Sequence, residues 1–147
     1  MSQEHHLTMA TPEENKAAVR EFFAEIWNNR SEAAIDRFVP ENAAGNDPDF
    51  GTGREAFRAQ WKQWMAAFPD LHFELIDMIA EGDQVLTRWE LTGTHSDAPF
   101  MGVEPTGTEI RVQGMSFDRM ENGQCIEGFD GWDGIGLRRQ LGLYDGA

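Results

Sequence analysis

The chain has 147 residues, a length typical of one domain, and 40% of them are hydrophobic, which excludes a disordered chain. Its formal charge of −14 disfavours binding to nucleic acid phosphates and to anionic membrane surfaces. Every apolar run falls short of the ~18 residues that a membrane span needs, and the N-terminus has no apolar signal core. We therefore expect a cytoplasmic protein with a small ligand, either neutral or bound through a local Arg.

Neither the cysteine nor the N-terminal histidines suggest a reactive or metal-binding site. Cys125 is the one cysteine, so it cannot form an intrachain disulfide, which suits a reducing cytosol. No Cys–His motif surrounds it, and we favour a packing role over a nucleophile. His5 and His6 lie in residues 1–10, which we expect to be a flexible N-terminus before a single domain of residues 11–147. The remaining His and acidic residues show no metal-ligand spacing, so no metal is expected.

Three helices are expected in the first half of the chain. Thr11-Pro12-Glu13-Glu14 has the residues of a capping box, with Pro at the first helical position. Ser31 can cap a second, shorter helix. A third helix is expected from about Arg54 to Phe68, because its apolar residues recur at helical spacing. Residues 41–53, between the second and third helices, form an irregular stretch.

From Leu71 onward the apolar residues alternate with polar ones, as in a strand. Ile76 breaks this alternation, which indicates a bulge or a strand buried on both faces. Turn residues at Glu81-Gly82-Asp83 and Glu121-Asn122-Gly123 separate the later strands, and the second of these is a strong hairpin signal. Further strands are expected over residues 84–95, 108–120 and 124–132, followed by a tail of residues 133–143.

Helices followed by an antiparallel meander predict an α+β fold with the helices on one face of the sheet. A strongly curved sheet that is closed by helices leaves a hollow. Such hollows bind small apolar molecules through a few polar groups.

Several motifs, taken together in their order along the chain, resemble those of a known family. They are Gly82-Asp83 before a long strand, Gly93-Thr94-His95 at its end, the G-x-x-P-T-G pattern of residues 102–107, the turn of residues 119–123 (with Asn in place of the family's Asp), and residues 129–133 and 140–142. The chain beyond Met9 resembles the SnoaL-like polyketide cyclases of the nuclear transport factor 2-like superfamily. The resemblance implies a cone-shaped α+β fold, with three N-terminal helices packed on a curved antiparallel or mixed sheet around a pocket.

The resemblance also implies a cofactor-independent ester cyclase that closes a ring in a small aromatic polyketide-like substrate by intramolecular aldol condensation. One carboxyl group can perform both proton transfers if it alternates between its ionised and protonated forms. It first removes a proton from the carbon beside one carbonyl and then protonates the oxygen of the carbonyl that is attacked. A hydrophobic cavity assists by raising the carboxyl pKa. The family's acid/base aspartate aligns with Asp130, without a gap from Gln140-Leu141-Gly142. The alternative for Asp130 is a solvated carboxylate at a sheet edge. Asp133 is its rival, but a cap or turn role in the tail explains Asp133 better.

The neighbours of Asp130 depend on the hairpin register. A two-residue Asn122-Gly123 turn pairs Asp130 with Met115, whereas a three-residue loop with Gly123 left-handed pairs it with Gly114 and places Ser116 on its face. The resemblance favours the second register, because a polar site residue of the family maps onto Ser116.

Ser116 is a departure from the characterised cyclase, which has a histidine at this position. A serine supplies no group that titrates near neutral pH, although it can hydrogen-bond an enolate oxygen. Gly114 and Gly128, on the same predicted face, have an alternative role as sites of close approach or strand bending.

Asn46 and three tryptophans are further candidates for substrate contacts. Asn46 precedes Asp47-Pro48 and can orient a substrate carbonyl, or it is simply a turn-forming residue. Trp61 and Trp64 belong to the stripe of the third helix, most of which must be core, with one or two rings left to roof the cavity. Trp132, with Phe129, gives Asp130 an apolar setting.

Arg88 and His95 complete the candidate substrate-binding set. Arg88 can pair with Asp130 or hold a substrate carboxylate, and its alternative is an outward ion pair with Glu90 or Glu74. His95 is either an acid/base at the pocket rim or a structural histidine, which is the favoured role. His72 is expected to face solvent.

Three classes of function remain open. The first is the cyclase, and the second is another reaction of the same fold, such as that of a dehydratase, an isomerase or an epoxide hydrolase, which needs an Arg and two carboxylates around one water. The third is a non-catalytic ligand-binding or dimerisation module. The strand aromatics predict a homo-oligomer, a dimer or tetramer formed through the open sheet face.

Overall fold

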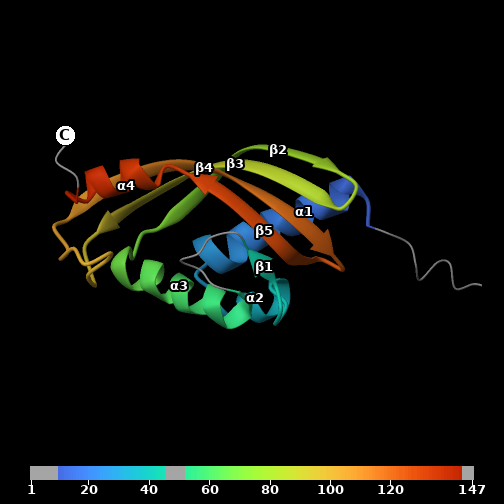
Figure 1. Cartoon of the computed structure of the whole chain (residues 1–147), viewed down its shortest axis with the longest axis horizontal. Helices are drawn as coiled ribbons and strands as arrows, with labels where there is room; N and C mark the ends of the chain where they lie inside the picture. Colours follow the sequence, from blue (N-terminus) through green and yellow to red (C-terminus); the bar gives the residue numbers. More distant parts are fainter. Residues whose placement is uncertain (1–9, 46–51, 144–147) are drawn as a thin grey trace, which may run out of the picture.

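A computed structural model describes residues 10–45 and 52–143, which form an α+β fold with helices packed on a five-stranded mixed sheet (Figure 1). The strand order is β1-β5-β4-β3-β2, with β1 parallel to β5 and the other pairs antiparallel. The elements are α1 (Pro12–Phe22), the π-helix η2 (Phe23–Asn28), α2 (Glu32–Phe38), β1 (Ala44–Gly45), α3 (Arg54–Ala67), β2 (His72–Glu81), β3 (Gln84–His95), β4 (Thr108–Glu121), β5 (Gln124–Trp132) and α4 (Gly134–Gln140).

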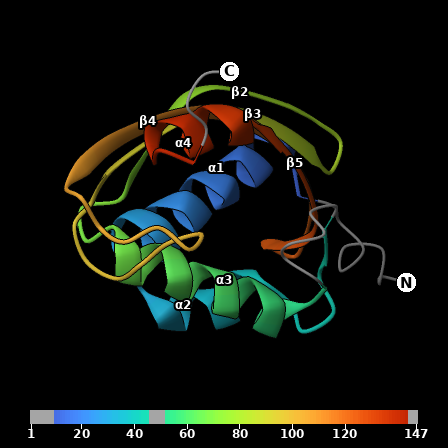
Figure 2. The same ribbon diagram turned by 60° about the vertical axis from the view of Figure 1, so that its left-hand side comes forward.

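The sheet arches over α1, and α2 and α3 lie on the far side of α1 (Figure 2). This arrangement confirms the expected α+β class and the three N-terminal helices on a curved sheet. None of the helices in the described part of the chain is long and apolar enough to cross a membrane.

The local signals at the helix ends act as predicted. Thr11 Oγ1 accepts a hydrogen bond from the Glu14 amide at 3.1 Å, and Glu14 Oε1 accepts one from the Thr11 amide at 2.8 Å, which completes the capping box. Asp133 caps α4, because its Oδ1 accepts a hydrogen bond from the Gly136 amide at 2.8 Å. Three features differ from the expectation. The first helix continues as the wider π-helix η2, and the tail contains a short helix. The stretch of residues 41–53, expected to be irregular, contains the short strand β1, which pairs with β5.

Two bulges adjust the sheet. The β2–β3 register shifts between Leu75 and Asp77, so of the two alternatives at Ile76 the structure shows the bulge. A second shift lies between Arg119 and Met120, because Arg119 pairs with Glu127 and Met120 pairs with Cys125. Ile126 is therefore the extra residue on β5.

The second bulge changes the predicted neighbours of Asp130. Asn122 and Gly123 form a two-residue turn with φ of 54° and 78°. The extra residue then shifts the register by one, so Asp130 pairs with Ser116 instead of Met115 or Gly114. Both predicted pairings were wrong, although the second had placed Ser116 on the correct face.

The core lies between the concave face of the sheet and the helices. On β3, the inward residues alternate with partly or fully exposed ones and include Val85, Trp89 and Leu91, all less than 10% exposed. They pack with aromatic side chains from η2 and α3. Gly114 on β4 has its own part in this packing, because a Cβ there would lie 2.5 Å from Trp89 Cη2 and 2.8 Å from Trp132 Cβ.

This close approach predicts that Gly114→Ala destabilises the fold. Overpacking of this kind costs about 1–3 kcal/mol, and we expect a loss of that size in the free energy of unfolding measured in urea. Gly131→Ala is the matched control on β5, because a Cβ there meets nothing within 4 Å. Equal stability of the two variants would contradict the packing described.

Candidate functional site

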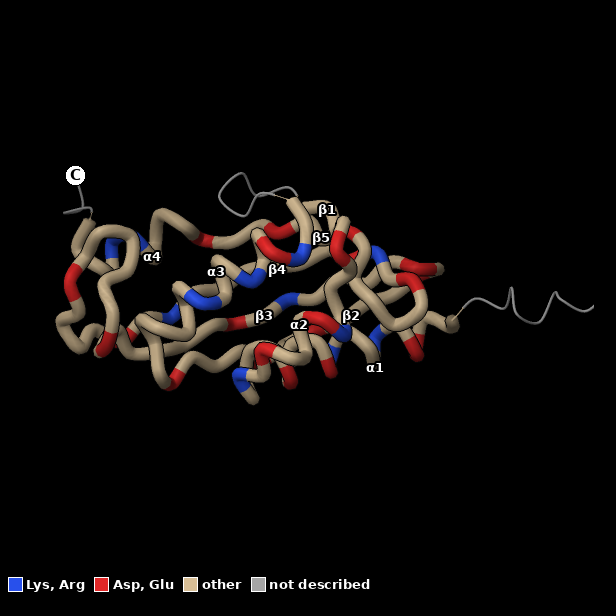
Figure 3. The backbone as a smooth tube through the Cα atoms, turned by 90° about the horizontal axis from the view of Figure 1, so that it is seen from below, with Lys and Arg blue, Asp and Glu red and all other residues tan. Residues whose placement is uncertain are grey.

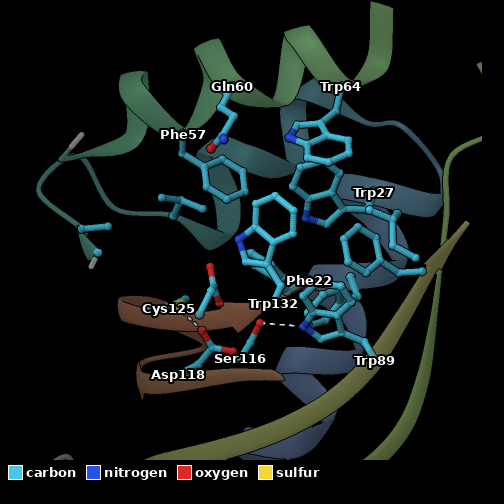
Figure 4. A pocket seen from close by; sticks show the side chains of 18 of the residues that line it. Phe22, Trp27, Phe57, Gln60, Trp64, Trp89, Ser116, Asp118, Cys125 and Trp132 are labelled. Atoms are coloured by element: carbon cyan, nitrogen blue, oxygen red, sulfur yellow. Dashed lines mark hydrogen bonds between the residues drawn. The ribbon is translucent and has the colours of Figure 1, made fainter. Parts of the chain in front are cut away.

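A cavity of about 1110 Å³, including the space at its open mouth, lies between the concave face of the sheet and the helices. Its walls are mostly aromatic. Figure 4 shows the indoles of Trp27, Trp64, Trp89 and Trp132 around one space, with the Phe57 ring beside them. Walls of this kind suit a flat, apolar ligand.

The polar side chains of the sheet wall come from β4 and β5. Ser116 pairs with Asp130, and Asp118 pairs with Gly128, so all four positions lie on the cavity side of the sheet. Cys125 also lines this wall. Asp130 is half-buried there.

Asp118 is a buried carboxyl that the sequence analysis did not single out. Its side chain lines the cavity, and the residue is only 7% exposed. Burial, reinforced by the negative charge on Asp130, raises the pKa of the Asp118 carboxyl to about 7. The signal was present in the sequence, because Asp118 follows Ser116 by two residues and so shares its face of the strand.

The space for Asp118 comes from the opposite strand. A Cβ at Gly128 would lie 3.3 Å from Asp118 Oδ1, so the glycine leaves room for the carboxyl. The Cys125 thiol donates a hydrogen bond to the same oxygen, with Sγ and Oδ1 3.3 Å apart. Burial and the nearby Asp118 raise the pKa of Cys125 well above its usual value. The thiol therefore stays protonated and acts as a donor, in agreement with the packing role predicted for it.

Ser116 is held by a neighbouring indole. Trp89 Nε1 donates a hydrogen bond to Ser116 Oγ at 2.9 Å, and Ser116 is buried. Because Oγ accepts this bond, its own proton remains available for an oxygen of a bound molecule.

Gln60 on α3 provides a polar atom on the opposite wall. Its Oε1 is buried and has no hydrogen-bond partner among the described residues. Figure 4 shows Gln60 across the cavity from Asp118 and Ser116. A buried carbonyl oxygen without a partner is costly, so a ligand that donates a hydrogen bond there would gain affinity.

Four of the candidate residues line the cavity: Trp64, Ser116, Asp130 and Trp132. The alternation of β5 brings Asp130 and Trp132 to the same face. Asn46 lies outside the described residues. His72 is exposed, as expected.

Three other predicted site residues do not line this cavity. Arg88 is nearly half exposed and donates to Asp77 Oδ2, because it lies between two inward residues of β3 and so faces outward. The outward ion pair of the alternative is therefore present, with Asp77 as the acid in place of Glu90 or Glu74.

His95 and Trp61 are structural residues in this fold. His95 is fully buried, with Nε2 2.9 Å from the Ala98 carbonyl oxygen and its ring against Phe68. Trp61 is buried, and its Nε1 donates to the Ile26 carbonyl at 2.8 Å. The residues of α3 that line the cavity are Phe57, Gln60 and Trp64.

Among the described residues, no group of three or more His, Cys, Asp or Glu is arranged to hold a metal ion. The cavity wall carries carboxyl, hydroxyl, thiol and amide groups. Such groups can bind and orient a ligand, and the carboxyl groups can transfer protons.

Comparison with known proteins agrees with this geometry. The family model of the SnoaL-like polyketide cyclases matches residues 17–141, whereas no curated protein matches the chain in sequence. Similar solved structures include TsrD from Streptomyces laurentii, at a TM-score of 0.82 and 24% identity, covering 92% of this chain and 99% of that chain. AclR from Streptomyces galilaeus, provisionally called a hydroxylase, has a TM-score of 0.81 and 28% identity, covering 91% and 88%. IdmH from Streptomyces antibioticus, provisionally called a polyketide cyclase, has a TM-score of 0.73 and 26% identity, covering 87% and 98%.

The burial of Asp118 predicts a pH-dependent stability. A carboxyl whose pKa rises from 3.8 to about 7 on folding stabilises the fold fully below pH 3.8, and this contribution is lost as the pH rises through 7. The loss amounts to about 4 kcal/mol, at about 1.4 kcal/mol per pKa unit. Asp118→Asn removes it, so we expect the variant to exceed the wild type in free energy of unfolding at pH 8 and to gain little at pH 4. Urea titrations at both pH values measure the difference; a gain that is the same at both would contradict the assignment.

Proposed function

The chain belongs to the SnoaL-like polyketide cyclase family, and on that premise we propose that it is a cofactor-independent cyclase of a small aromatic polyketide-like ester. The observation that carries this proposal is the position of Asp130 in the wall of a large, aromatic cavity. The proposed reaction is an intramolecular aldol condensation. We place the protein in the cytoplasm, as its composition predicts.

The cavity groups fit the proton transfers of such a ring closure. The Asp130 carboxylate removes a proton from the carbon beside one carbonyl, and the resulting enolate carbon attacks a second carbonyl of the same molecule. The Ser116 hydroxyl, fixed by Trp89 Nε1, donates a hydrogen bond to the enolate oxygen. The aromatic walls hold the chain folded, so that the two reacting carbons meet without a loss of entropy at the moment of reaction.

The two walls of the cavity indicate which substrate it accepts. The indoles suit a planar ring system, with its reacting carbonyls at the sheet wall beside Asp130 and Ser116. On the opposite wall, Gln60 Oε1 has no hydrogen-bond partner among the described residues, and it suits a hydroxyl at the far end of the molecule. Figure 3 shows Lys and Arg scattered along the chain among more numerous Asp and Glu, which agrees with a small-molecule partner rather than a nucleic acid.

The alternative functions find less support. An epoxide hydrolase needs an arginine beside its two carboxylates, and none of the described residues that line the cavity is an arginine. Arg88, the candidate for that role, faces outward to Asp77. A purely structural module predicts a filled interior, whereas this fold has an open cavity of about 1110 Å³, including the space at its mouth.

The cyclase proposal predicts that Asp130→Asn lowers kcat by about 10²–10⁴-fold, the usual contribution of an acid/base group. Tricyclic polyketide keto-esters are the test substrates, and ring closure is followed by absorbance and mass spectrometry. Asp133→Asn is the matched control, because it makes the same chemical change three residues away, at a helix cap where Asn serves equally well. Turnover by Asp130→Asn at the wild-type rate would refute the assignment.

The outer face of the sheet supports the proposal of a homo-oligomer. It exposes Phe129 (60%), Phe117 (45%) and Met115 (45%) on the neighbouring strands β5 and β4, and Ile79 (67%) on β2. An apolar face of this kind is usually covered by a partner, and a second copy of the sheet covers it symmetrically.

We expect light scattering to show a dimer or tetramer of the wild type. Replacing both Phe117 and Phe129 by Ser should shift the mass towards the monomer, because both rings lie on the outer face. Ile135→Ser is the control, since Ile135 is 55% exposed but lies on α4 rather than on the sheet. A monomeric wild type would overturn this proposal and leave the cyclase assignment in place.

A further inference from the structure

The Asp118 carboxyl lies in the cavity wall but has no role in the ring closure described above. Asp118 is less exposed than any other ionisable group of that wall, and its room depends on a glycine in the facing strand. Because it pairs with Gly128, it is the diagonal neighbour of Asp130 on the same face of the sheet, a position where Cβ atoms lie within about 7 Å. The two carboxyls therefore face one cavity from adjacent strands.

We propose that Asp118 and Asp130 form a pair that shares one proton, with Asp130 as the base and Asp118 as the acid of the ring closure. This inference rests on the proposed function, and it assigns a second catalytic residue to the same site. It also replaces a single carboxyl that must perform both proton transfers in turn.

The surroundings of the two carboxyls divide the roles between them. Asp118 is almost fully buried, while Asp130 is half-buried at the cavity wall. Two adjacent carboxylates in an apolar site are too costly to ionise together, and burial plus the charge on Asp130 raise the pKa of Asp118 to about 7. The proton therefore belongs on Asp118, and the negative charge on Asp130.

Apart from Asp130, the described side chains that line the cavity with Asp118 are a thiol and uncharged groups. Among the described residues of the cavity wall, the third titratable side chain is Cys125, which donates to Asp118 Oδ1. The helices contribute aromatic and aliphatic side chains and the uncharged Gln60. Because Cys125 engages Oδ1, the carboxyl can carry its proton on Oδ2.

The proposed step balances. Asp130 takes the proton from the carbon beside the first carbonyl, and the electron pair of that C–H bond forms the new carbon–carbon bond with the second carbonyl carbon. The π electrons of the second carbonyl move to its oxygen, which takes the proton from Asp118. The pair then holds its proton on Asp130, and transfer back to Asp118 restores the resting state without any co-reactant.

This pair also explains how the site functions with a serine at position 116. The resemblance places a histidine there in the characterised cyclase, and a serine cannot titrate near neutral pH. Asp118 follows Ser116 by two residues on the same face of β4, and it supplies the titrating group that Ser116 lacks.

The first test needs no substrate. NMR titration of the protein labelled with ¹³C at the aspartate carboxyl carbons follows each carboxyl, with assignments from Asp118→Asn and Asp130→Asn. We expect Asp118 to titrate near pH 7 in the wild type and distinctly lower in Asp130→Asn, because the neighbouring charge is gone. Cys125→Ala should move it upward, since a donor to the carboxylate is lost, and the control Asp133→Asn should leave it in place. An ordinary carboxyl titration for Asp118, or a value unaffected by Asp130→Asn, overturns the inference.

The second test uses the tricyclic keto-esters. We expect the wild-type kcat to fall as the pH rises through about 7, and Asp118→Asn to lose about 10²–10⁴-fold in kcat together with this descending limb. A structural role would leave the pH profile unchanged. If the wild type turns over the substrate and Asp118→Asn is fully active, the inference is overturned while the cyclase proposal stands. If the wild type shows no turnover, the cyclase proposal is refuted. The NMR titration then still decides whether the two carboxyls share a proton.

Discussion

The arrangement of the site depends on the register between β4 and β5. The tight Asn122-Gly123 turn alone would set Asp130 opposite Met115, with its side chain on the face opposite to Ser116. Ile126, the extra residue of the bulge, shifts the register by one and returns Asp130 to the face of Ser116 and Asp118. A single unpaired residue on one strand therefore decides whether the carboxyls meet in the cavity or lie on opposite faces of the sheet.

Glycines opposite large or charged side chains complete this wall. Gly114 lets the Trp89 ring approach β4 closely, and Gly128 leaves room for the Asp118 carboxyl. Trp89 in turn fixes the Ser116 hydroxyl through its indole N–H. The polar groups of the cavity are thus positioned by backbone spacing and by aromatic packing.

The cavity as a whole is a compromise between stability and chemistry. A carboxyl buried beside a second carboxyl opposes folding once it ionises, and Gln60 Oε1 adds a buried acceptor without a partner among the described residues. Features of this kind concentrate at functional sites, where a bound ligand can satisfy them. The large aromatic core beneath the arch of the sheet supplies the packing that tolerates these costs.

Local patterns in the sequence predicted the elements, the class of fold and the family resemblance. Helix caps at Thr11 and Asp133, the bulge at Ile76 and the hairpin at Asn122-Gly123 are all set by residues within a few positions of one another, so they can be read from the chain. Alternation along β5 likewise placed Asp130 and Trp132 on one face. The contacts within the cavity depend on the tertiary structure, because the partner of a side chain across the sheet is set by the register between the two strands, including any bulge. The β4–β5 register brings Asp118 to the same cavity as Asp130. The packing of α3 against the rest of the fold decides which of its side chains reach the cavity, so that Gln60 lines it while Trp61 is buried in the core, as is His95.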